Sequence, residues 1–505
     1  MENTGAFSRL RDRLRDVHNL RMAAAVLNWD MEVCMPPKGA AARGGQLATL
    51  AALAHERFTH PETGTLIRQA QDNQDTLADD ERAALREVDY DYRRAARIPE
   101  NFVRRFAQTR SAAYHAWLDA RKQSDFAVFQ THLQKLVTLA RELADYLGYE
   151  DTPYNALLED FERGMTTAQL RAVFDELAPR QRALIERIMN APTQPDAAWL
   201  EQTWDADAQW AFTERVLRDM GYDFDAGRQD KSAHPFTTNF SIGDVRITTR
   251  LNERDLFSAL FSSIHECGHA LYEQGFPPED EGTILAEAPS LGIHESQSRL
   301  WENIIGRSLP FWRHYMPVLR EHFPGQLDNV DAEQVYAAAN RVAPSLIRVE
   351  ADECTYNLHI ILRFELETAL IEGNLAAADL PAAWNEKMAA WLGVAVPDDA
   401  NGCLQDIHWS HGTFGYFPTY ALGNLYAAQM FDAVTKAIPG IMSSVGRGEF
   451  TPLLAWLREN VHRVGRRKTT PEIVRDATGE EPAAAAFLKY LENKYAPLYG
   501  LAQVG

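Results

Sequence analysis

The chain has 505 residues, with 51 basic and 71 acidic side chains and a formal net charge of −20. Hydrophobic residues at 46% and charged residues at 24% are ordinary for a soluble globular protein and exclude wholesale disorder. The acidic balance argues against a nucleic acid as partner, because phosphate binding depends on clustered Lys and Arg.

Membrane and secretion signals are not visible in the sequence. No segment reaches the roughly 18 apolar residues of a spanning helix, and the charged start MENTGAFSRLRDRLRDVHNL lacks the apolar run of a signal peptide. The four cysteines are too few and too scattered to stabilise the chain by disulfides, which favours a reducing compartment. We therefore expect a cytoplasmic protein with no membrane partner.

The coarse pattern of the chain is helical, with apolar residues at three- and four-residue spacing between polar faces. The clearest predicted helices are Asp80–Ala96, Glu100–Gln123, Asp125–Leu147 and Thr167–Met189. No internal repeat and no Gly/Ser- or Pro-rich linker divides the chain. Residues 1–505 are therefore expected to form one large helical unit.

One segment breaks the helical pattern. Residues 235–250 read PFTTNFSIGDVRITTR, in which Gly243-Asp244 is the expected two-residue turn of a β-hairpin. The cross-strand pairs expected from that turn are Ile242 with Val245 and Phe240 with Ile247. The hairpin is either a packing element or the wall of a cleft whose free edge pairs with an extended peptide.

A well-specified helix follows the hairpin and carries an H-E-x-x-H motif. Asn252 can cap the helix, with Asp255 three residues on, and an apolar stripe runs along it. The motif consists of His265, Glu266 and His269. Residues four apart on a helix stand about 5–6 Å apart at Cβ, so both imidazoles can reach one metal ion.

The other motif positions also have a physical reading. Glu266 is rotated to the side of the histidine pair, where it can take a proton from metal-bound water and pass it to a leaving amine. Gly268 leaves room for a second backbone or a substrate, and Cys267 is expected to face away and pack. With 15 histidines in 505 residues, chance supplies about 0.03 such motifs per chain. The alternative is two helix histidines held by neighbours in a buried core.

A catalytic zinc site needs three protein ligands and one open position. Gly275 stands where an extended motif would carry a third histidine, so a downstream carboxylate is the alternative. Glu295, 26 residues after His269, lies in a helix-like segment that also offers His294 and Glu302. Spacing alone does not decide among these three.

Six motifs occur in a fixed order along the chain. They are HPF at 234–236, D-x-R-x-T at 244–248, H-E-x-x-H at 265–269, H-E-S-Q at 294–297, I-R-x-x-A-D at 347–352 and G-x-x-Q-D-x-H-W at 402–409. Together they closely resemble the motifs of the carboxypeptidase Taq family of thermostable metallocarboxypeptidases. The early N-W-D-x-E-V-x-M-P-P-K-G at 28–39 also looks like that family.

The resemblance implies a mainly α-helical metallopeptidase of two lobes around a deep central groove, with a small β-hairpin or sheet at the active site and its motifs within residues 234–420. It implies His265, His269 and Glu295 as metal ligands and Glu266 as general base. It also implies hydrolysis of the C-terminal residue from peptides, one Zn²⁺ (or Co²⁺) per subunit, and a homodimer.

An exopeptidase acting at the C-terminus must bind a free carboxylate, and Arg is suited to bidentate capture of that group. Arg348 is our first choice and Arg246 our second. Alternatively, each of these two arginines binds no substrate and forms a salt bridge with a neighbouring carboxylate, such as that of Glu350, Asp352 or Asp244. His234 is expected either to line the groove or to cap the hairpin.

The tetrahedral oxyanion of peptide hydrolysis needs donors beside the metal. His408, Tyr416 and Tyr420 fit that need, and similar residues serve this way in the wider class of helical metallopeptidases. Tyrosines in an aromatic run are otherwise usually core residues. Gln405 and Asp406 are candidates for orienting an imidazole.

Three hypotheses follow from these residues. The leading one is a cytoplasmic zinc carboxypeptidase that acts on peptides with a free C-terminus. The second is an oligopeptidase or dipeptidyl carboxypeptidase on the same scaffold, which only the carboxylate-binding Arg separates from the first. The third is a non-catalytic helical scaffold with a structural metal. Intact Glu266 argues against the third, since a closed structural site has no use for that base.

Overall fold

The computed structural model describes residues 4–502, and most of this part of the chain is α-helical. The helices are α1 (Thr4–Val33), α2 (Ala40–Thr59), α3 (Pro61–Gln71), α4 (Asp79–Arg97), α5 (Glu100–Gln123), α6 (Ala127–Leu147), α7 (Pro153–Leu158), α8 (Thr167–Met189), α9 (Ala206–Met220), α10 (Leu256–Glu273), α11 (Leu291–Arg299), α12 (Leu309–His322), α13 (Ala332–Ala339), α14 (Glu353–Glu372), α15 (Leu380–Leu392), α16 (Pro418–Ala437), α17 (Ile441–Val445), α18 (Thr451–Asn460), α19 (Thr470–Thr478) and α20 (Ala485–Leu498). The strands are β1 (Gly227–Lys231), β2 (Thr237–Ser241) and β3 (Asp244–Thr249).

The four helices predicted from periodicity are confirmed as α4, α5, α6 and α8, with ends that differ by at most two residues. Local capping explains two of these ends. Thr166 and Gln169 form a reciprocal capping box at the start of α8. α6 starts two residues later than predicted because the Asp125 carboxylate accepts the backbone N–H of Ala127 and forms a turn first.

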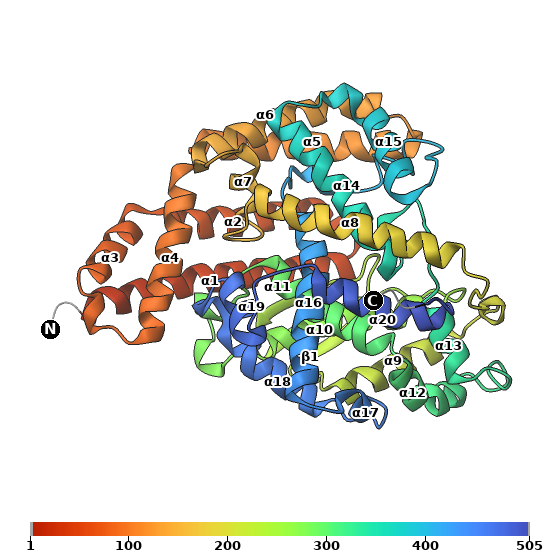
Figure 1. Cartoon of the computed structure of the whole chain (residues 1–505). Coiled ribbons are helices and arrows are strands. Elements are labelled where there is room, and N and C mark those ends of the chain that lie inside the picture. The colour runs from red at the N-terminus through yellow and green to blue at the C-terminus, as the bar shows by residue number, and fades with distance from the viewer. Residues whose placement is uncertain (1–3, 503–505) are drawn as a thin grey trace.

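The helices fall into three groups in space (Figure 1). Helices α5 to α8 lie at the top with α14 and α15, the remaining later helices lie below them, and α1 to α4 extend to the left. One large apolar core is shared by the helices from α5 to α20, whereas α1 to α4 have two small clusters of their own. The division of the chain into two lobes around a groove stays a prediction.

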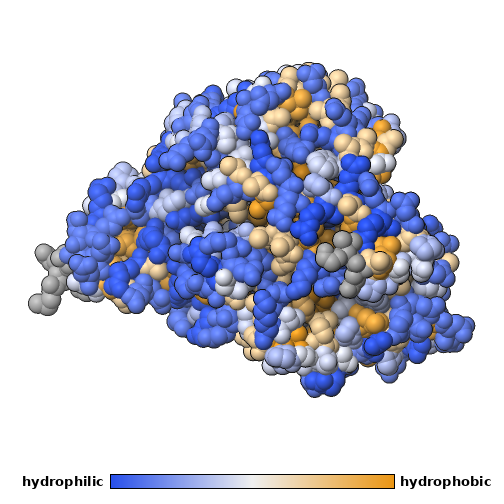
Figure 2. Space-filling view, viewed as in Figure 1, coloured by the Kyte–Doolittle hydropathy of each residue, from blue (hydrophilic) through white to orange (hydrophobic). Residues whose placement is uncertain are grey.

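The surface agrees with the composition. Hydrophilic residues cover most of the face shown in Figure 2, and hydrophobic residues are scattered over it in small groups. No helix among the described residues is both long and apolar enough to cross a membrane.

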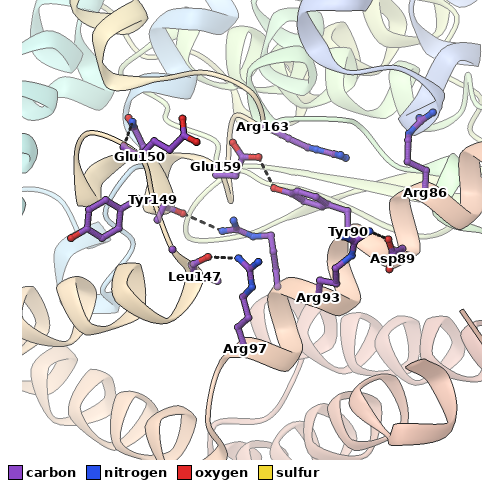
Figure 3. A pocket seen from close by; sticks show the side chains of 14 residues that line it. Arg86, Asp89, Tyr90, Arg93, Arg97, Leu147, Tyr149, Glu150, Glu159 and Arg163 are labelled. Carbon is purple, nitrogen blue, oxygen red and sulfur yellow. Dashed lines mark hydrogen bonds and ion pairs between the residues drawn. The ribbon is translucent and has the colours of Figure 1, made fainter. Parts of the chain in front are cut away.

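Arginines join α4 to the segment that follows α6. Arg94 pairs with Asp160. Arg97 donates to the carbonyl of Leu147 at the end of α6 (Figure 3). These arginines line a solvent-open cavity of about 420 Å³ together with Tyr90. The guanidinium groups mostly pair with carboxylates and carbonyls of the protein itself, so they tie α4 to the body.

A second contact holds α4 through Arg466, which lies in the 3₁₀ segment His462–Arg467. Its guanidinium pairs with Asp91 at 2.9 Å, Glu287 at 3.1 Å and Glu87 at 3.3 Å. The Glu87 side chain is only 4% exposed, so this ion pair is largely shielded from water. Removing Arg466 leaves Asp91 without an ion-pair partner among the described residues, whereas Glu87 keeps Arg86 and Arg163.

We therefore predict that Arg466→Gln destabilises the protein by about 2 kcal/mol and lowers its thermal midpoint. The matched control is Arg463→Gln, because Arg463 pairs with Glu459 on the surface, where such pairs contribute little. Thermal unfolding followed by circular dichroism measures both variants. Equal midpoints for the two variants would contradict the prediction.

The register of the hairpin differs from the predicted one. β2 and β3 are antiparallel as expected, but the turn residues are Ile242 and Gly243, and the pairs include Asn239 with Val245 and Thr237 with Ile247. A bulge between Asn239 and Ser241 shifts the strand by one residue. Asp244 belongs to β3, where it pairs with Ser241, and its carboxylate accepts two hydrogen bonds from Arg246, at 2.8 and 2.9 Å.

A third strand was not predicted. β1 pairs in parallel with β3, so the strand order is β1-β3-β2 and β2 is an edge strand. The sequence of β1, GRQDK, has no alternating apolar residues, so a period-two pattern could not reveal it. The sheet packs against α10 through β2 and β3.

The start of α10 also differs from the prediction. Asp255, and not Asn252, caps the helix: its carboxylate accepts the backbone N–H groups of Phe257 and Ser258 at 3.0 and 3.1 Å. The Asn252 side chain accepts the N–H of Arg254 in the preceding turn. This placement fixes the beginning of the helix that carries the H-E-x-x-H motif.

Candidate metal centre

Two histidines of α10 and one glutamate of α11 converge at the centre of the molecule. Nε2 of His265 and Nε2 of His269 lie 3.4 and 3.3 Å from the same oxygen, Oε2, of Glu295. One ligand atom from each residue lies within 4.8 Å of the other two. Of the three downstream residues left open by spacing, Glu295 is the one that faces the histidine Nε2 atoms.

The distances between these atoms suit a tetrahedral metal ion. Bonds of about 2.0–2.1 Å to nitrogen and oxygen place tetrahedral ligand atoms about 3.3–3.4 Å apart, and the distances from Glu295 Oε2 agree with this. Two imidazole nitrogens and one carboxylate oxygen are also a donor set of catalytic zinc sites. The residues therefore fit a divalent ion with three protein ligands and one open position.

Gly268 explains how the two helices come close enough. A Cβ at this position would lie 2.6 Å from Cα of Ser298 and 2.7 Å from the carbonyl oxygen of Gln297, both backbone atoms of α11. Any side chain here would push α11 away and withdraw Glu295 from the histidines. The expectation that Gly268 admits a second backbone is confirmed, and Cys267 is buried in the core as predicted.

Two further charged residues hold the ligands in place. Glu302 Oε2 lies 2.9 Å from Nδ1 of His265, and Nε of Arg299 donates to Oε1 of Glu295 at 2.6 Å. Glu302 belongs to a π-helical segment, Leu300–Gly306, that continues α11. Such partners fix the orientation of a metal-binding imidazole or carboxylate. The sequence analysis missed Arg299, although its spacing of four residues from Glu295 was a usable signal.

Both carboxylates at this site are held in the ionised form. Burial alone would raise the pKa of Glu302, but the hydrogen bond to His265 and the charge of Arg299 lower it to about 2. Burial likewise opposes ionisation of Glu295, yet Arg299 and His265 hold its pKa well below the usual range. Arg299 and Arg307 balance much of this negative charge, and the ionised Glu295 offers a carboxylate oxygen beside two imidazoles, a donor set that a divalent cation can use.

His294 lies beside the centre without joining it. Its ring stacks on that of His269 at 4.4 Å between centroids, and its Nε2 lies 2.8 Å from Oε1 of Glu273. Nδ1 of His269 is buried and has no hydrogen-bond partner among the described residues. The orientation of His269 therefore depends on stacking, whereas that of His265 depends on Glu302.

Glu266 connects α10 to the sheet. Its Oε2 accepts a hydrogen bond of 2.6 Å from Oγ1 of Thr237, on the edge strand β2. The side chain is buried, and this burial raises its pKa. Thr237, which the sequence analysis did not single out, thus fixes the carboxylate that neighbours the two histidines.

An aromatic cluster from α16 and the segment before it stands next to Glu295. His408, Tyr416 and Tyr420 are mutual neighbours: the ring centroids of the tyrosines are 5.3 Å apart, and Nε2 of His408 lies 3.3 Å from the Tyr420 hydroxyl. α16 approaches α11 closely, since a Cβ on Gly423 would lie 2.5 Å from Cγ of Glu295. The three predicted oxyanion donors are therefore brought together on the Glu295 side of the site.

Arg348 is buried beside this cluster. Its Nε donates to Asp406 at 2.9 Å and its NH1 to the Tyr356 hydroxyl at 2.8 Å, and its guanidinium lies 4.9 Å from the ring centre of Tyr420. Burial lowers the pKa of Arg348, but Asp406 more than offsets this and raises it well above the usual value. The residue is a permanent cation, 6% exposed.

Other sequence expectations need correction. Gln405 and Asp406 do not hold an imidazole: Asp406 pairs with Arg348 and Arg363, and Gln405 accepts from both arginines. A carboxylate between two buried guanidinium groups is bound more strongly by their charges than by a neutral ring. These motif residues therefore anchor arginines.

No hydrogen bond or ion pair among the described residues joins Arg246 or His234 to the histidine–glutamate cluster. Arg246 is bound by Asp244 through two hydrogen bonds, and its guanidinium lies over Trp29 and Phe240 at 4.4 and 4.8 Å. The alternative salt-bridge reading of Arg246 is thus the observed one. His234 is exposed in the loop before β2, and its carbonyl accepts a hydrogen bond from Ser232.

Comparison with known proteins agrees with this geometry. Residues 9–495 match the family described as carboxypeptidase Taq (M32) metallopeptidase. The chain belongs to this family. It is similar to thermostable carboxypeptidase 1 of Thermus thermophilus, with 44% identity over 99% of this chain and 100% of that protein. It is also similar to carboxypeptidase 1 of Bacillus subtilis, with 38% identity over 97% of each chain.

Solved structures give the same result. The crystal structure of an M32 carboxypeptidase from Deinococcus radiodurans R1 matches with a TM-score of 0.96 and 40% identity, over 98% of this chain and 100% of that one. The resemblance drawn from the six motifs and the mainly helical fold are both confirmed. The protein is a metallocarboxypeptidase of the M32 family.

The role of Glu302 in this M32 enzyme can be tested by its affinity for metal. We predict that Glu302→Gln weakens Zn²⁺ binding about tenfold, because the charge that orients and polarises His265 is lost. Competition with a chromophoric chelator measures the dissociation constant. Glu273→Gln is the control, since Glu273 contacts His294 and none of the three converging residues. Unchanged affinity in Glu302→Gln would show that the hydrogen bond at Nδ1 is dispensable.

Proposed function

We propose that this enzyme is a zinc carboxypeptidase, with cobalt as an alternative ion, that binds one metal per subunit and removes single C-terminal residues from peptides. The observation that carries the proposal is the convergence of His265, His269 and Glu295 with Glu266 beside them. A homodimer in the cytoplasm, as the family resemblance and the cysteine content imply, is part of the same proposal.

Glu266 is proposed as the general base. When bound, the metal ion supplies a Lewis acid that polarises the scissile carbonyl and activates a water molecule. Glu266 takes the proton of that water and delivers it to the leaving amine. The hydrogen bond from Thr237 occupies Oε2, which leaves Oε1 for the proton, and the pKa raised by burial makes the carboxylate a stronger base.

His408, Tyr416 and Tyr420 are proposed to donate hydrogen bonds to the developing oxyanion. Burial raises the pKa of both tyrosines, so their hydroxyls keep their protons at neutral pH. Burial lowers the pKa of His408 to about 3, so its ring is neutral and carries one N–H. Neutral donors stabilise negative charge without forming an ion pair with a substrate carboxylate.

Arg348 is proposed to bind the free carboxylate of the substrate. Two of its three guanidinium nitrogens are used by Asp406 and Tyr356, whereas NH2 has no hydrogen-bond partner among the described residues. The guanidinium group of Arg348 lies over the ring of Tyr420 and is therefore next to the proposed oxyanion donors. The contacts of Arg246 with Asp244 and with two aromatic rings make it the weaker candidate.

The alternative on the same scaffold is an oligopeptidase or dipeptidyl carboxypeptidase. The buried Arg348 favours recognition of a chain end, because the guanidinium nitrogen not bonded to Asp406 or Tyr356 binds a terminal carboxylate more strongly than a neutral peptide carbonyl. Membership in a metallopeptidase family argues against the non-catalytic scaffold.

We predict that the metal-loaded enzyme removes single residues stepwise from unmodified peptides and cleaves the matching C-terminal amides roughly 100-fold more slowly. Mass spectrometry of the products measures both rates. Glu266→Gln should lower kcat by about 10²–10⁴ while retaining the metal. Equal cleavage of acid and amide, or release of dipeptides, would move the function to the oligopeptidase alternative.

We further predict that Arg348→Gln raises KM for free-acid peptides and reduces the preference for acid over amide by at least about tenfold. Arg246→Gln, which breaks a contact within the hairpin, should leave that preference unchanged. Thermal unfolding of both variants identifies any loss caused by unfolding alone. If Arg348→Gln keeps the preference for free-acid over amide peptides, Arg348 does not bind the substrate carboxylate.

A further inference from the structure

One buried carboxylate holds the segment that carries His408 and Tyr416 at both of its ends. Oε1 of Glu367, on α14, accepts a hydrogen bond from Nε1 of Trp409 at 2.8 Å, and Oε2 accepts one from the backbone N–H of Gly415 at 3.0 Å. Trp409 directly follows His408, and Gly415 directly precedes Tyr416. A single side chain therefore binds the neighbours of both proposed oxyanion donors.

Both carboxylate oxygens of Glu367 must accept hydrogen bonds, because an N–H group faces each of them. A third donor, the Tyr154 hydroxyl of α7, lies 2.7 Å from Oε2. Three donors on two oxygens match an ionised carboxylate, which accepts only. The side chain is 0% exposed, and burial raises its pKa to about 7 although all three donors lower it. The carboxylate has no cationic hydrogen-bond partner among the described residues, although the charge of Arg363 also lowers its pKa.

The path of the segment leaves little freedom around these two bonds. Gly415 has a φ of 93°, and a Cβ there would lie 2.8 Å from the carbonyl carbon of Leu157 in α7. The Thr413 hydroxyl donates to the His408 carbonyl at 2.8 Å, which closes the loop on itself. With both ends tied to Glu367, the rings of His408 and Tyr416 lie 5.2 Å apart between centroids.

We propose that Glu367 is a positioning residue for the reaction, which sets the placement of His408 and Tyr416 beside Glu295 through Trp409 and Gly415. Glu367 does not touch the substrate. The proposal rests on the proposed function, since it gives His408 and Tyr416 a role in stabilising the oxyanion. Displacement of such donors by about 1 Å can lower a rate roughly 100-fold.

The substitution Glu367→Gln tests this with almost no change of shape. A glutamine presents one oxygen and one NH2 group where the carboxylate presents two oxygens. If the NH2 replaces Oε1, it faces the N–H of Trp409, and if it replaces Oε2, it faces the N–H of Gly415. Either orientation sets a donor against a donor, so one end of the segment must lose its hydrogen bond.

For Glu367→Gln we expect kcat for free-acid peptides to fall roughly 10- to 100-fold and KM to change by less than about twofold. Hydrogen exchange followed by mass spectrometry should show faster exchange in peptides covering residues 408–416. Glu353→Gln is the matched control. Glu353 is a buried glutamate of the same helix, but its carboxylate binds Lys494 and Tyr495, far in sequence from this segment. It should lower the thermal midpoint without either effect.

Two further variants make the test decisive. Glu367→Gln combined with His408→Gln should lose less activity than the product of the two single losses, because the part of the effect that acts through His408 disappears with that ring while the part through Tyr416 remains. Trp409→Phe removes one donor and keeps the aromatic packing, and should reproduce part of the kcat loss even if Glu367→Gln does not fold.

Contrary results are equally clear. Unchanged exchange at residues 408–416, or a kcat loss that adds fully to that of His408→Gln, would overturn the proposal. The exchange measurement needs no substrate. The exchange result therefore decides whether Glu367 holds residues 408–416 even if the enzyme releases no C-terminal residues. Failure to release them would refute the proposed function.

Discussion

The close approach of α10 and α11 at Gly268 is the contact on which the rest of the site depends. It allows Glu295 to reach both histidines, because the backbone of Ser298 occupies the space that a side chain at residue 268 would need. α16 presses on the other side of Glu295 at Gly423. The geometry of the candidate metal ligands is thus determined by three packed helices, which hold side chains more rigidly than loops do.

This packing brings many charges into the interior, and their mutual pairing offsets the cost of burial. Arg299 and Glu302 fix Glu295 and His265, and Asp406 lies between Arg348 and Arg363. Breaking one such pair leaves a buried charge without a partner, which costs more than the pair contributes. Charged residues of the six motifs and their neighbours therefore serve two purposes here: some face the site, and others hold those residues in position.

Spacing in the sequence predicted site residues correctly where they lie on one helix, but it did not predict which residues of two separate segments come together. His265 and His269 share a helix face whatever surrounds them, so their pairing followed from the motif alone. Spacing left Glu295, His294 and Glu302 open and the family resemblance implied Glu295; the packing of this stretch against α10 shows that Glu295 faces the Nε2 atoms of the two histidines. Arg299 was within reach of the same helical spacing, whereas Thr237 and Glu367 had no local signal, since their partners are distant in sequence.

The sequence by itself determined the mainly helical fold, the ends of the long amphipathic helices and the placement of His265 and His269 on one helix face, because these depend on periodicity and spacing within continuous segments. It also indicated the family, through six motifs that resemble those of its members. Tertiary structure decided the parallel strand β1, the bulged hairpin register, the choice of Glu295 and the binding of Asp406 to two arginines instead of an imidazole. Each of these depends on contacts between residues far apart in the chain, and neither local propensity nor spacing specifies which distant segments will pack together.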